Sequence, residues 1–213
     1  MPAVRLYGLA DSVYVRIARI ALHEKGVDYT LEPTDVFDPA TLDPRYAALH
    51  PFRRIPALDH DGFRLYETSA IARYIDENFP GPALQPADPR ERARMNQIVS
   101  VVDSYAYPAL IRQLVVERLF AGEEGRTASS ATVEAGCEAG RRSIDAIAAL
   151  ADGPYLTGGM FTLADIWFAP IVAYTRLTKE GAAMLADTPL LTRWWEKVQV
   201  RPSVVATRYP KEG

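Results

Sequence analysis

Apolar and polar residues alternate along the first part of the chain in a pattern that predicts two short strands joined by a helix. The run Val4–Tyr7 is apolar and β-branched and stops at Gly8, and apolar residues then recur at roughly helical spacing after Ser12. Gly26 ends that helix, and residues 27–31 alternate as a second strand. Since parallel strands need such a crossover, the pattern predicts a βαβ unit.

The next segment predicts a hairpin followed by a second helix. A loop rich in proline and aspartate contains a helical turn or two around residues 43–49. Residues 55–58 read as a strand entered through a proline, and the turn signal Asp61-Gly62 leads into its hairpin partner, residues 63–66. A helix opens at Thr68 and ends at the run Pro80-Gly81-Pro82. The first 80 residues therefore predict a small α/β domain.

The chain divides at a stretch rich in proline. Residues 81–89, GPALQPADP, are the best linker, since prolines remove backbone donors and favour extended chain. We expect domains at residues 1–80 and 90–213, the second all-helical. Its expected helices span about residues 89–120, 128–151, 163–178 and 190–200.

Composition narrows the function classes. The 24 Lys and Arg residues nearly balance 27 Asp and Glu, which gives no reason to expect a nucleic-acid or anionic-membrane partner. The first residues have no basic, apolar leader, and no run of about 18 apolar residues occurs, so we expect a cytoplasmic protein outside the membrane. Cys137 is the only cysteine, which excludes an internal disulfide and favours a small core residue over a nucleophile.

Three blocks then carry a resemblance: VRLYGLADSVYVRIARIALHEKGVDY, HPFRRIPALDHDGFRLYETSAIARYI and GPYLTGGMFTLADIWFAPIV. In their order and spacing they resemble glutathione S-transferases, in particular serine-type enzymes of the phi, theta and zeta classes and their bacterial relatives. The resemblance implies a thioredoxin-like domain over residues 1–80 that binds glutathione. It also implies an all-helical domain over residues 90–213 that holds an electrophile.

Ser12 is the catalytic candidate that the resemblance implies. A free thiol with a pKa of about 8.5 is mostly protonated at neutral pH, and the thiolate is the nucleophile. A hydroxyl that donates to sulfur lowers that pKa, and so does a helix N-terminus. The structural alternative is that Ser12 only caps the helix. Tyr7 is the rival donor, because other classes use a tyrosine near the end of the first strand.

Other residues carry glutathione-binding roles only through the resemblance. Ile55-Pro56 matches a cis-proline turn whose backbone meets the cysteinyl part of glutathione, although a trans proline at a strand start is locally acceptable. Glu67-Thr68 matches a pair that holds the γ-glutamyl end, or it only caps a helix. Arg54, beside Arg53, is a candidate for the glycyl carboxylate. The basic pair of phi enzymes has no clear counterpart between residues 35 and 46.

The electrophile pocket is expected between the two domains, where apolar and aromatic side chains usually form small-molecule sites. Its candidates are Leu9 and Ala10 in the loop that also holds Asp11, and Tyr105, Tyr107 and Ile111 on the long helix. Two tyrosines two positions apart point in different directions on a helix, so only one is expected to face the pocket. Separately, Thr162 and Asp165 have the spacing of a capping box, whose expected role is folding.

The expected function is transfer of glutathione, as its thiolate, to hydrophobic electrophiles in detoxification, with glutathione as co-substrate and no metal. The family also implies a homodimer, in which Phe52 is a candidate lock residue inserted into the partner. Two alternatives stay open: a glutathione-dependent disulfide reductase or peroxidase, and a non-catalytic binding module on the same fold.

Overall fold

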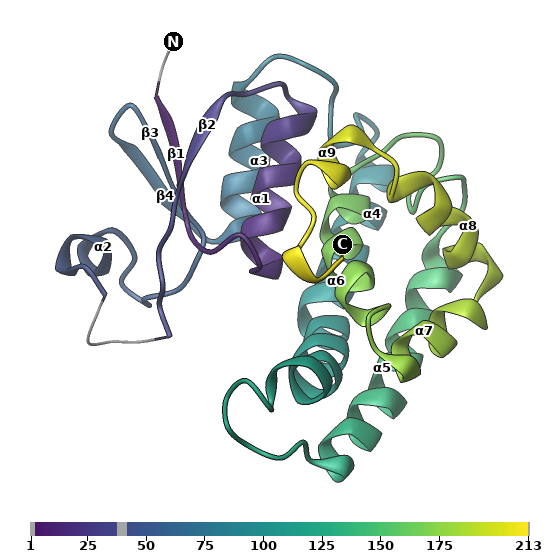
Figure 1. Cartoon of the computed structure of the whole chain (residues 1–213). Helices are drawn as coiled ribbons and strands as arrows, with labels where there is room; N and C mark the ends of the chain where they lie inside the picture. Colours follow the sequence, from purple (N-terminus) through teal and green to yellow (C-terminus); the bar gives the residue numbers. More distant parts are fainter. Residues whose placement is uncertain (1–2, 38–41, 213) are drawn as a thin grey trace. The chain divides into compact units, whose positions relative to one another are not determined.

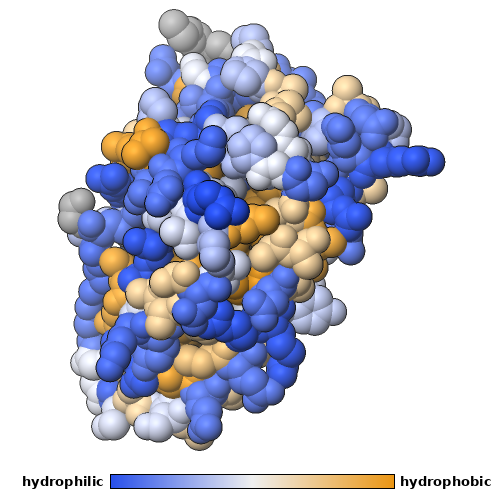
Figure 2. Space-filling view, turned by 90° about the vertical axis from the view of Figure 1, so that its right-hand side faces the viewer, coloured by the Kyte–Doolittle hydropathy of each residue, from blue (hydrophilic) through white to orange (hydrophobic). Residues whose placement is uncertain are grey.

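The computed structural model describes residues 3–37 and 42–212 of the chain (Figure 1). Its contacts divide it into two compact units, one of residues 1–83 with 202–211 and the other of residues 84–201. Figure 2 shows a mostly polar face on which hydrophobic side chains form small groups. Among the described residues, no helix has the length and apolar content needed to cross a membrane.

The first unit is a mixed four-stranded sheet with helices on both faces. Its strands are β1 (Val4–Tyr7), β2 (Tyr29–Glu32), β3 (Ala57–His60) and β4 (Phe63–Tyr66), in the order β2-β1-β3-β4. β1 is parallel to β2 and antiparallel to β3, as the predicted βαβ unit and hairpin require. Helices α1 (Val13–Glu24) and α3 (Thr68–Asn78) cover one face, and α2 (Pro44–Leu49) lies over the other (Figure 1).

The second unit is helical, as predicted, but two of its details differ from the sequence pattern. The expected single helix over residues 89–120 is α4 (Pro89–Val101) continued by η1 (Val102–Phe120). The helix η1 is a π-helix, in which each N–H bonds the carbonyl five residues back instead of four, as Ala121 N–H bonds Val116 O at its end. The helix α7 (Lys179–Ala186) was not predicted, because Gly181 weakens its helical signal. The other helices are α5 (Ser130–Leu150), α6 (Leu163–Thr175) and α8 (Pro189–Val198).

The C-terminal segment belongs to the first unit, whereas the sequence assigned all of residues 90–213 to the helical domain. The segment of residues 202–211 contains α9 (Pro202–Val205) and the first two residues of the short helix η2 (Pro210–Glu212). Arg16 of α1 is fully buried; its Nη2 donates to Val204 O at 3.2 Å, and its guanidinium lies 4.2 Å from the Tyr209 ring centroid. Buried arginine therefore fixes the segment to α1, a long-range contact that no local pattern encodes.

The predicted capping box at the start of α6 is confirmed, and it extends into a larger buried network. Asp165 is fully buried and accepts hydrogen bonds from Thr162 N at 2.8 Å, Leu156 N at 2.9 Å and Trp194 Nε1 at 2.7 Å. Burial raises the pKa of this carboxyl, and the hydrogen bonds oppose that rise. One side chain thus joins the loop before α6 to both α6 and α8.

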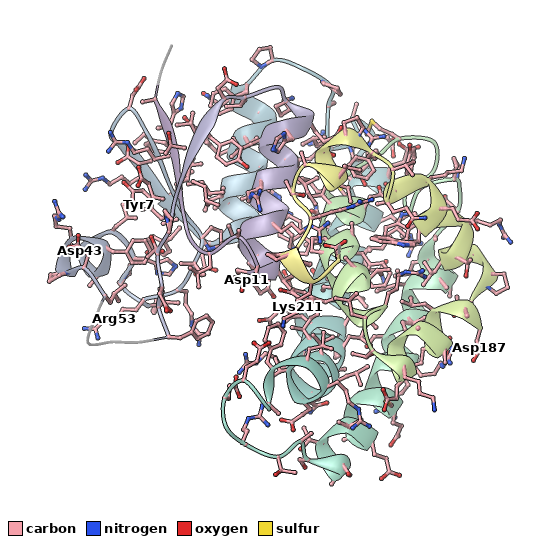
Figure 3. All side chains as sticks on the ribbon, viewed as in Figure 1. Tyr7, Asp11, Asp43, Arg53, Asp187 and Lys211 are labelled. Atoms are coloured by element: carbon pink, nitrogen blue, oxygen red, sulfur yellow. The ribbon has the colours of Figure 1, made fainter. Side chains whose placement is uncertain are left out.

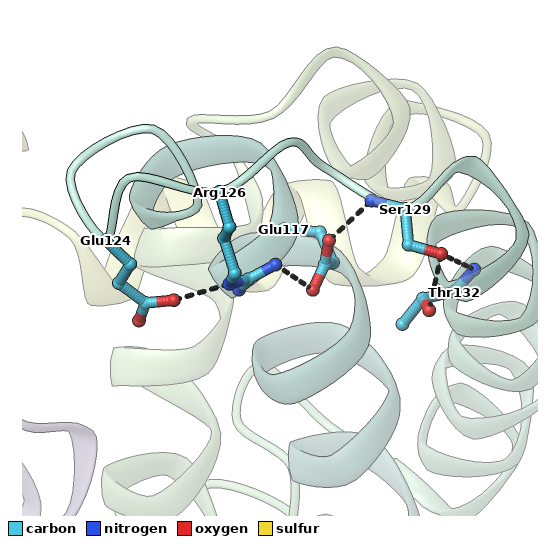
Figure 4. A network of polar contacts seen from close by, with 5 residues as sticks. All are labelled: Glu117, Glu124, Arg126, Ser129 and Thr132. Atoms are coloured by element: carbon cyan, nitrogen blue, oxygen red, sulfur yellow. Dashed lines mark hydrogen bonds and ion pairs between the residues drawn. The ribbon is translucent and has the colours of Figure 1, made fainter.

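A second polar network joins the end of η1 to the start of α5 (Figure 4). Glu117 accepts from Ser129 N–H at 2.7 Å and from Arg126 Nη1 at 2.6 Å, while Ser129 Oγ accepts from Thr132 N at 3.2 Å as the N-cap of α5. The Ser129 N–H bond, with help from Arg126, holds the pKa of Glu117 below its usual value of 4.5 against the effect of burial. The ionised carboxylate is therefore the form that supports this connection.

We expect Glu117→Gln to make the unfolding free energy less dependent on pH in acid. Since the folded-state pKa of Glu117 is lowered, its contribution is fully present above pH 4.5 and is lost as the pH falls through the folded-state pKa. The variant should be less stable than wild type near pH 7 and equally stable once Glu117 is protonated, as urea unfolding from pH 7 to 3 would show. Glu134→Gln, an exposed change on α5, is the control. A stability difference that does not vary with pH would contradict the argument.

Candidate functional site

The sheet register gathers three predicted site segments at one end of the first unit. Tyr7 at the end of β1 pairs with Ala57 at the start of β3, which in turn pairs with Tyr66 at the end of β4. The turn from β1 to α1, the loop before β3 and the start of α3 therefore meet at the same edge. Helices α1 and α3 both begin there, so both present the positive ends of their dipoles to this edge.

Gly8 lets two of these segments approach each other closely. A Cβ atom at Gly8 would lie 2.3 Å from Val15 Cγ2 and 3.3 Å from Ile55 Cβ. Such a contact would displace either α1 or the loop before β3, so a side chain at Gly8 is incompatible with this packing. The glycine thereby keeps the Ser12 turn against the loop that carries Ile55.

Ser12 is the N-cap of α1, so the predicted capping role is confirmed. The cap uses Ser12 Oγ as an acceptor and leaves the hydroxyl hydrogen available. Its Oγ accepts from Val15 N–H at 3.5 Å, a long hydrogen bond, and the side chain is half-buried. A hydroxyl has one donor and two acceptor positions, so accepting at the cap does not use the donor. Among the described residues, Ser12 Oγ donates to none. The cap and a donor to a ligand are therefore compatible roles.

The loop before β3 contains a cis peptide bond between Ile55 and Pro56, as the resemblance implied. Pro56 is buried and Ile55 is half-buried, while Arg53 and Arg54 are exposed. Arg53, labelled in Figure 3, has a φ of 50°, in the left-handed region. Both arginine side chains of this loop are therefore open to solvent.

Glu67 and Thr68 lie at the start of α3, at the same edge. Glu67 has a φ of 70° and its exposed side chain makes no capping bond, while Thr68 is buried. The first N–H groups of the helix that find carbonyl partners are those of Ala70 and Ile71, both bonded to Glu67 O. The preceding N–H groups of α3 point out of the helix, where an anion can accept from them.

Tyr7, the rival donor, lies on the other face of the sheet. Its neighbour Leu6 is buried under α1 and α3, and alternation along the strand turns Tyr7 toward α2 (Figure 3). There it lines a cavity of about 630 Å3 with Arg5, Glu32 and Tyr46, and its ring centroid lies 5.8 Å from that of Tyr46. The structure therefore separates Tyr7 from Ser12, which begins α1 on the opposite face.

The predicted electrophile contacts are not equivalent in the structure. Leu9 is half-buried and Ala10 exposed in the turn before α1. On η1, Tyr105 is 65% exposed and Ile111 only 6%, and Tyr107 lies between them in exposure. Tyr105 lines a groove of about 470 Å3 between η1 and α5, a groove that neither Tyr107 nor Ile111 borders. As expected from their spacing, the two tyrosines face different surroundings.

The sequence analysis missed Tyr46 and His50, which pack behind the loop before β3. Tyr46 is buried, and its hydroxyl donates to Arg54 O at 2.5 Å. The His50 ring is buried 4.8 Å from the Tyr66 ring; burial lowers the pKa of His50, and the nearby Glu67 charge raises it. A tyrosine in a six-residue helix gives no sequence signal, because its contact partner is fixed only by the loop conformation.

A mixed four-stranded sheet with a cis-proline before its third strand, joined to a helical unit, is the architecture of a glutathione transferase. Residues 6–83 match the family model for the glutathione S-transferase N-terminal domain, and residues 130–197 match the model for its C-terminal domain. The chain belongs to the glutathione S-transferase family.

Individual relatives are similar to this chain over nearly its whole length. Glutathione S-transferase 3 of Zea mays is 33% identical over 97% of this chain and 94% of its own length, and glutathione S-transferase 4 of Zea mays is 31% identical over 95% and 90%. The solved structure of glutathione S-transferase III in apo form superposes with a TM-score of 0.85 at 32% identity, covering 96% of this chain and 95% of that one. The predicted fold and the prediction of a glutathione transferase enzyme are confirmed.

Proposed function

We propose that this glutathione transferase is of the serine type, with Ser12 donating a hydrogen bond to the sulfur of bound glutathione. The observation that carries the proposal is the uncommitted Ser12 hydroxyl at the N-terminus of α1, at the edge where the three segments meet. A charge-assisted hydrogen bond and the α1 dipole both favour thiolate over thiol. The resemblance of the sequence to bacterial relatives of these enzymes stays a prediction.

Glutathione is proposed to bind in an extended form along this edge. Ile55 N–H and C=O would hold its cysteinyl part, while Glu67 would accept from its ammonium group and Thr68 with the start of α3 would donate to its γ-glutamyl carboxylate. The exposed guanidinium of Arg54 suits the glycyl carboxylate. Pro56, which follows Ile55, is buried.

The second substrate is proposed to be a small hydrophobic electrophile, in a detoxification reaction. A solved glutathione S-transferase I from maize, 26% identical with a TM-score of 0.85 over 97% of this chain and 96% of its own, is described in complex with an atrazine glutathione conjugate. Leu9, Ala10 and Tyr105 are the better candidates for electrophile contacts, because Ala10 and Tyr105 are exposed and Leu9 O accepts from Ser12 N–H at 3.1 Å. Tyr107 remains a candidate, whereas the burial of Ile111 argues for a packing role.

Reduction of disulfides or peroxides by bound glutathione is the second candidate activity. Helix α1 contains no cysteine, which argues against a mixed disulfide with the protein but not against attack by glutathione itself. The half-buried Cys137 is on α5, where burial raises the pKa of its thiol. A non-catalytic binding module is the third candidate, and the intact Ser12 turn weighs against it.

Two measurements on the wild-type protein test the function. Conjugation of glutathione to a generic aryl halide should be detectable across pH 6 to 9, and calorimetry should show glutathione binding. Binding without turnover of either an aryl halide or a peroxide would favour the binding module. No binding and no turnover would overturn the proposal.

The chain is further proposed to act as a cytoplasmic homodimer without a metal, a nucleic-acid partner or a membrane partner. Phe52 supports the dimer, because it is 67% exposed yet has aromatic neighbours, with ring centroids 6.3 Å from His50 and 6.2 Å from Tyr66. A large aromatic side chain that projects from a packed aromatic base is suited to fill a pocket on a second copy.

We expect Phe52→Ala to raise the dimer dissociation constant about 30-fold or more, the effect of losing an interface residue worth about 2 kcal/mol. Sedimentation across a concentration series would measure it. Phe37→Ala removes another exposed aromatic residue, 74% exposed, and should leave the dissociation constant unchanged. Equal affinities for wild type and Phe52→Ala would remove the lock from the proposal.

A further inference from the structure

Tyr46 makes one hydrogen bond that reaches the proposed glutathione-binding backbone from behind. It lies in α2, and its hydroxyl donates to Arg54 O at 2.5 Å. Its own backbone is tied at both ends, since Tyr46 N–H bonds Asp43 O at 2.9 Å and His50 N–H bonds Tyr46 O at 2.9 Å. The phenol is therefore held by α2, not by the loop that it contacts.

The hydrogen bond from Tyr46 to Arg54 O also determines the direction of Ile55 N–H, because of the geometry of the peptide group. Arg54 C=O and Ile55 N–H belong to the same planar peptide unit, so fixing the direction of the oxygen also fixes the direction of the N–H. In a trans peptide the two point to opposite sides. Among the described residues, Ile55 N–H donates to no backbone or side-chain acceptor. A donor on the oxygen also polarises the amide and strengthens the N–H as a donor.

The surroundings of Tyr46 keep this donor in place. Tyr46 is 5% exposed, and its ring centroid lies 5.8 Å from that of Tyr7 and 6.4 Å from that of His50. Burial, with a smaller effect of Tyr7, raises the pKa of the Tyr46 phenol, so it stays protonated throughout the pH range in which a thiol ionises. A protonated phenol keeps the hydrogen that it donates to Arg54 O.

We propose that Tyr46 is a positioning residue for glutathione: its hydroxyl, bonded to Arg54 O, orients the Ile55 N–H toward the cysteinyl part of the substrate, so that α2 supports the glutathione site from behind. This inference rests on the proposed function. Because the Tyr46 hydroxyl hydrogen is used in the bond to Arg54 O, its expected effect is on glutathione binding and not on thiol ionisation. The α2 helix, which lies over the face of the sheet opposite to α1, thereby acts on the site without lining it.

Tyr46→Phe tests the proposal, because it removes only the hydroxyl. The KM and the calorimetric dissociation constant for glutathione should each rise about 3- to 10-fold, the effect of one neutral hydrogen bond. The kcat, the KM for an aryl halide and the pKa of the bound thiol should not change. This pattern separates positioning from a purely structural role, which would lower the melting temperature and the active fraction and leave the glutathione KM unchanged.

Tyr74→Phe is the matched control. Tyr74 is a tyrosine of the same unit whose hydroxyl bonds His60 Nδ1 at 2.7 Å, away from the loop before β3. Its variant should keep the wild-type glutathione KM. An unchanged glutathione KM in Tyr46→Phe, or an equal rise in Tyr74→Phe, would overturn the inference. Since both comparisons require an active wild type, failure of the proposed function itself would already be evident as absent turnover.

Discussion

Ser12→Ala should raise the pKa of the thiol of bound glutathione by about 1 to 2 units and lower the conjugation rate near neutral pH roughly 10- to 100-fold. A hydrogen bond to a charged group contributes about 1.5 to 3 kcal/mol, and one pKa unit corresponds to about 1.4 kcal/mol. The pH profile of kcat/KM with an aryl halide measures both effects. At high pH, where the thiol ionises without help, the variant should approach the wild-type rate.

Because Ser12 also caps α1, the effect of Ser12→Ala on the thiol pKa must be separated from its effect on the stability of the protein. Ser129→Ala removes the comparable N-cap of α5, where Ser129 Oγ accepts from Thr132 N at 3.2 Å. A cap contributes about 1 kcal/mol, so both variants should lose similar stability, but only Ser12→Ala should shift the thiol pKa. Tyr7→Phe should leave the profile unchanged, since Tyr7 lies on the α2 side of the sheet. A shift in Tyr7→Phe alone would transfer the donor role to the tyrosine.

Asp165→Ala should lower the free energy of unfolding by about 3 to 5 kcal/mol, a large part of the 5 to 15 kcal/mol that is usual for a protein. The substitution leaves the N–H groups of Leu156 and Thr162 and the indole Nε1 of Trp194 buried without an acceptor. All three donor residues are buried in the wild-type protein. Urea unfolding followed by circular dichroism measures the change.

Asp187→Ala is the control for Asp165→Ala. Asp187 follows α7, its side chain is 71% exposed, and it pairs with Arg141 at 3.1 Å (Figure 3). Exposed ion pairs contribute little, so the variant should stay within about 0.5 kcal/mol of wild type. If Asp165→Ala were equally mild, the buried network would not be what joins the start of α6 to α8.

The elements that the sequence predicted well are those whose signal is local. The strand Val4–Tyr7, the helix after Ser12 and the hairpin around Asp61-Gly62 follow from periodicity, a cap and a turn pair, each within a few residues. The capping box of Asp165 was readable from spacing alone. Family resemblance added the cis bond before Pro56, which composition and periodicity cannot indicate.

The sequence by itself thus determined the βαβ unit, the hairpin, the helical second half and the residue types of the candidate site. Only the tertiary structure decided that Tyr7 faces α2, that the segment of residues 202–211 packs on buried Arg16, and that Tyr46 holds the peptide between Arg54 and Ile55. The physical reason is distance along the chain: Arg16 and Val204 are 188 positions apart. Such contacts depend on how whole elements pack, and no local propensity records them.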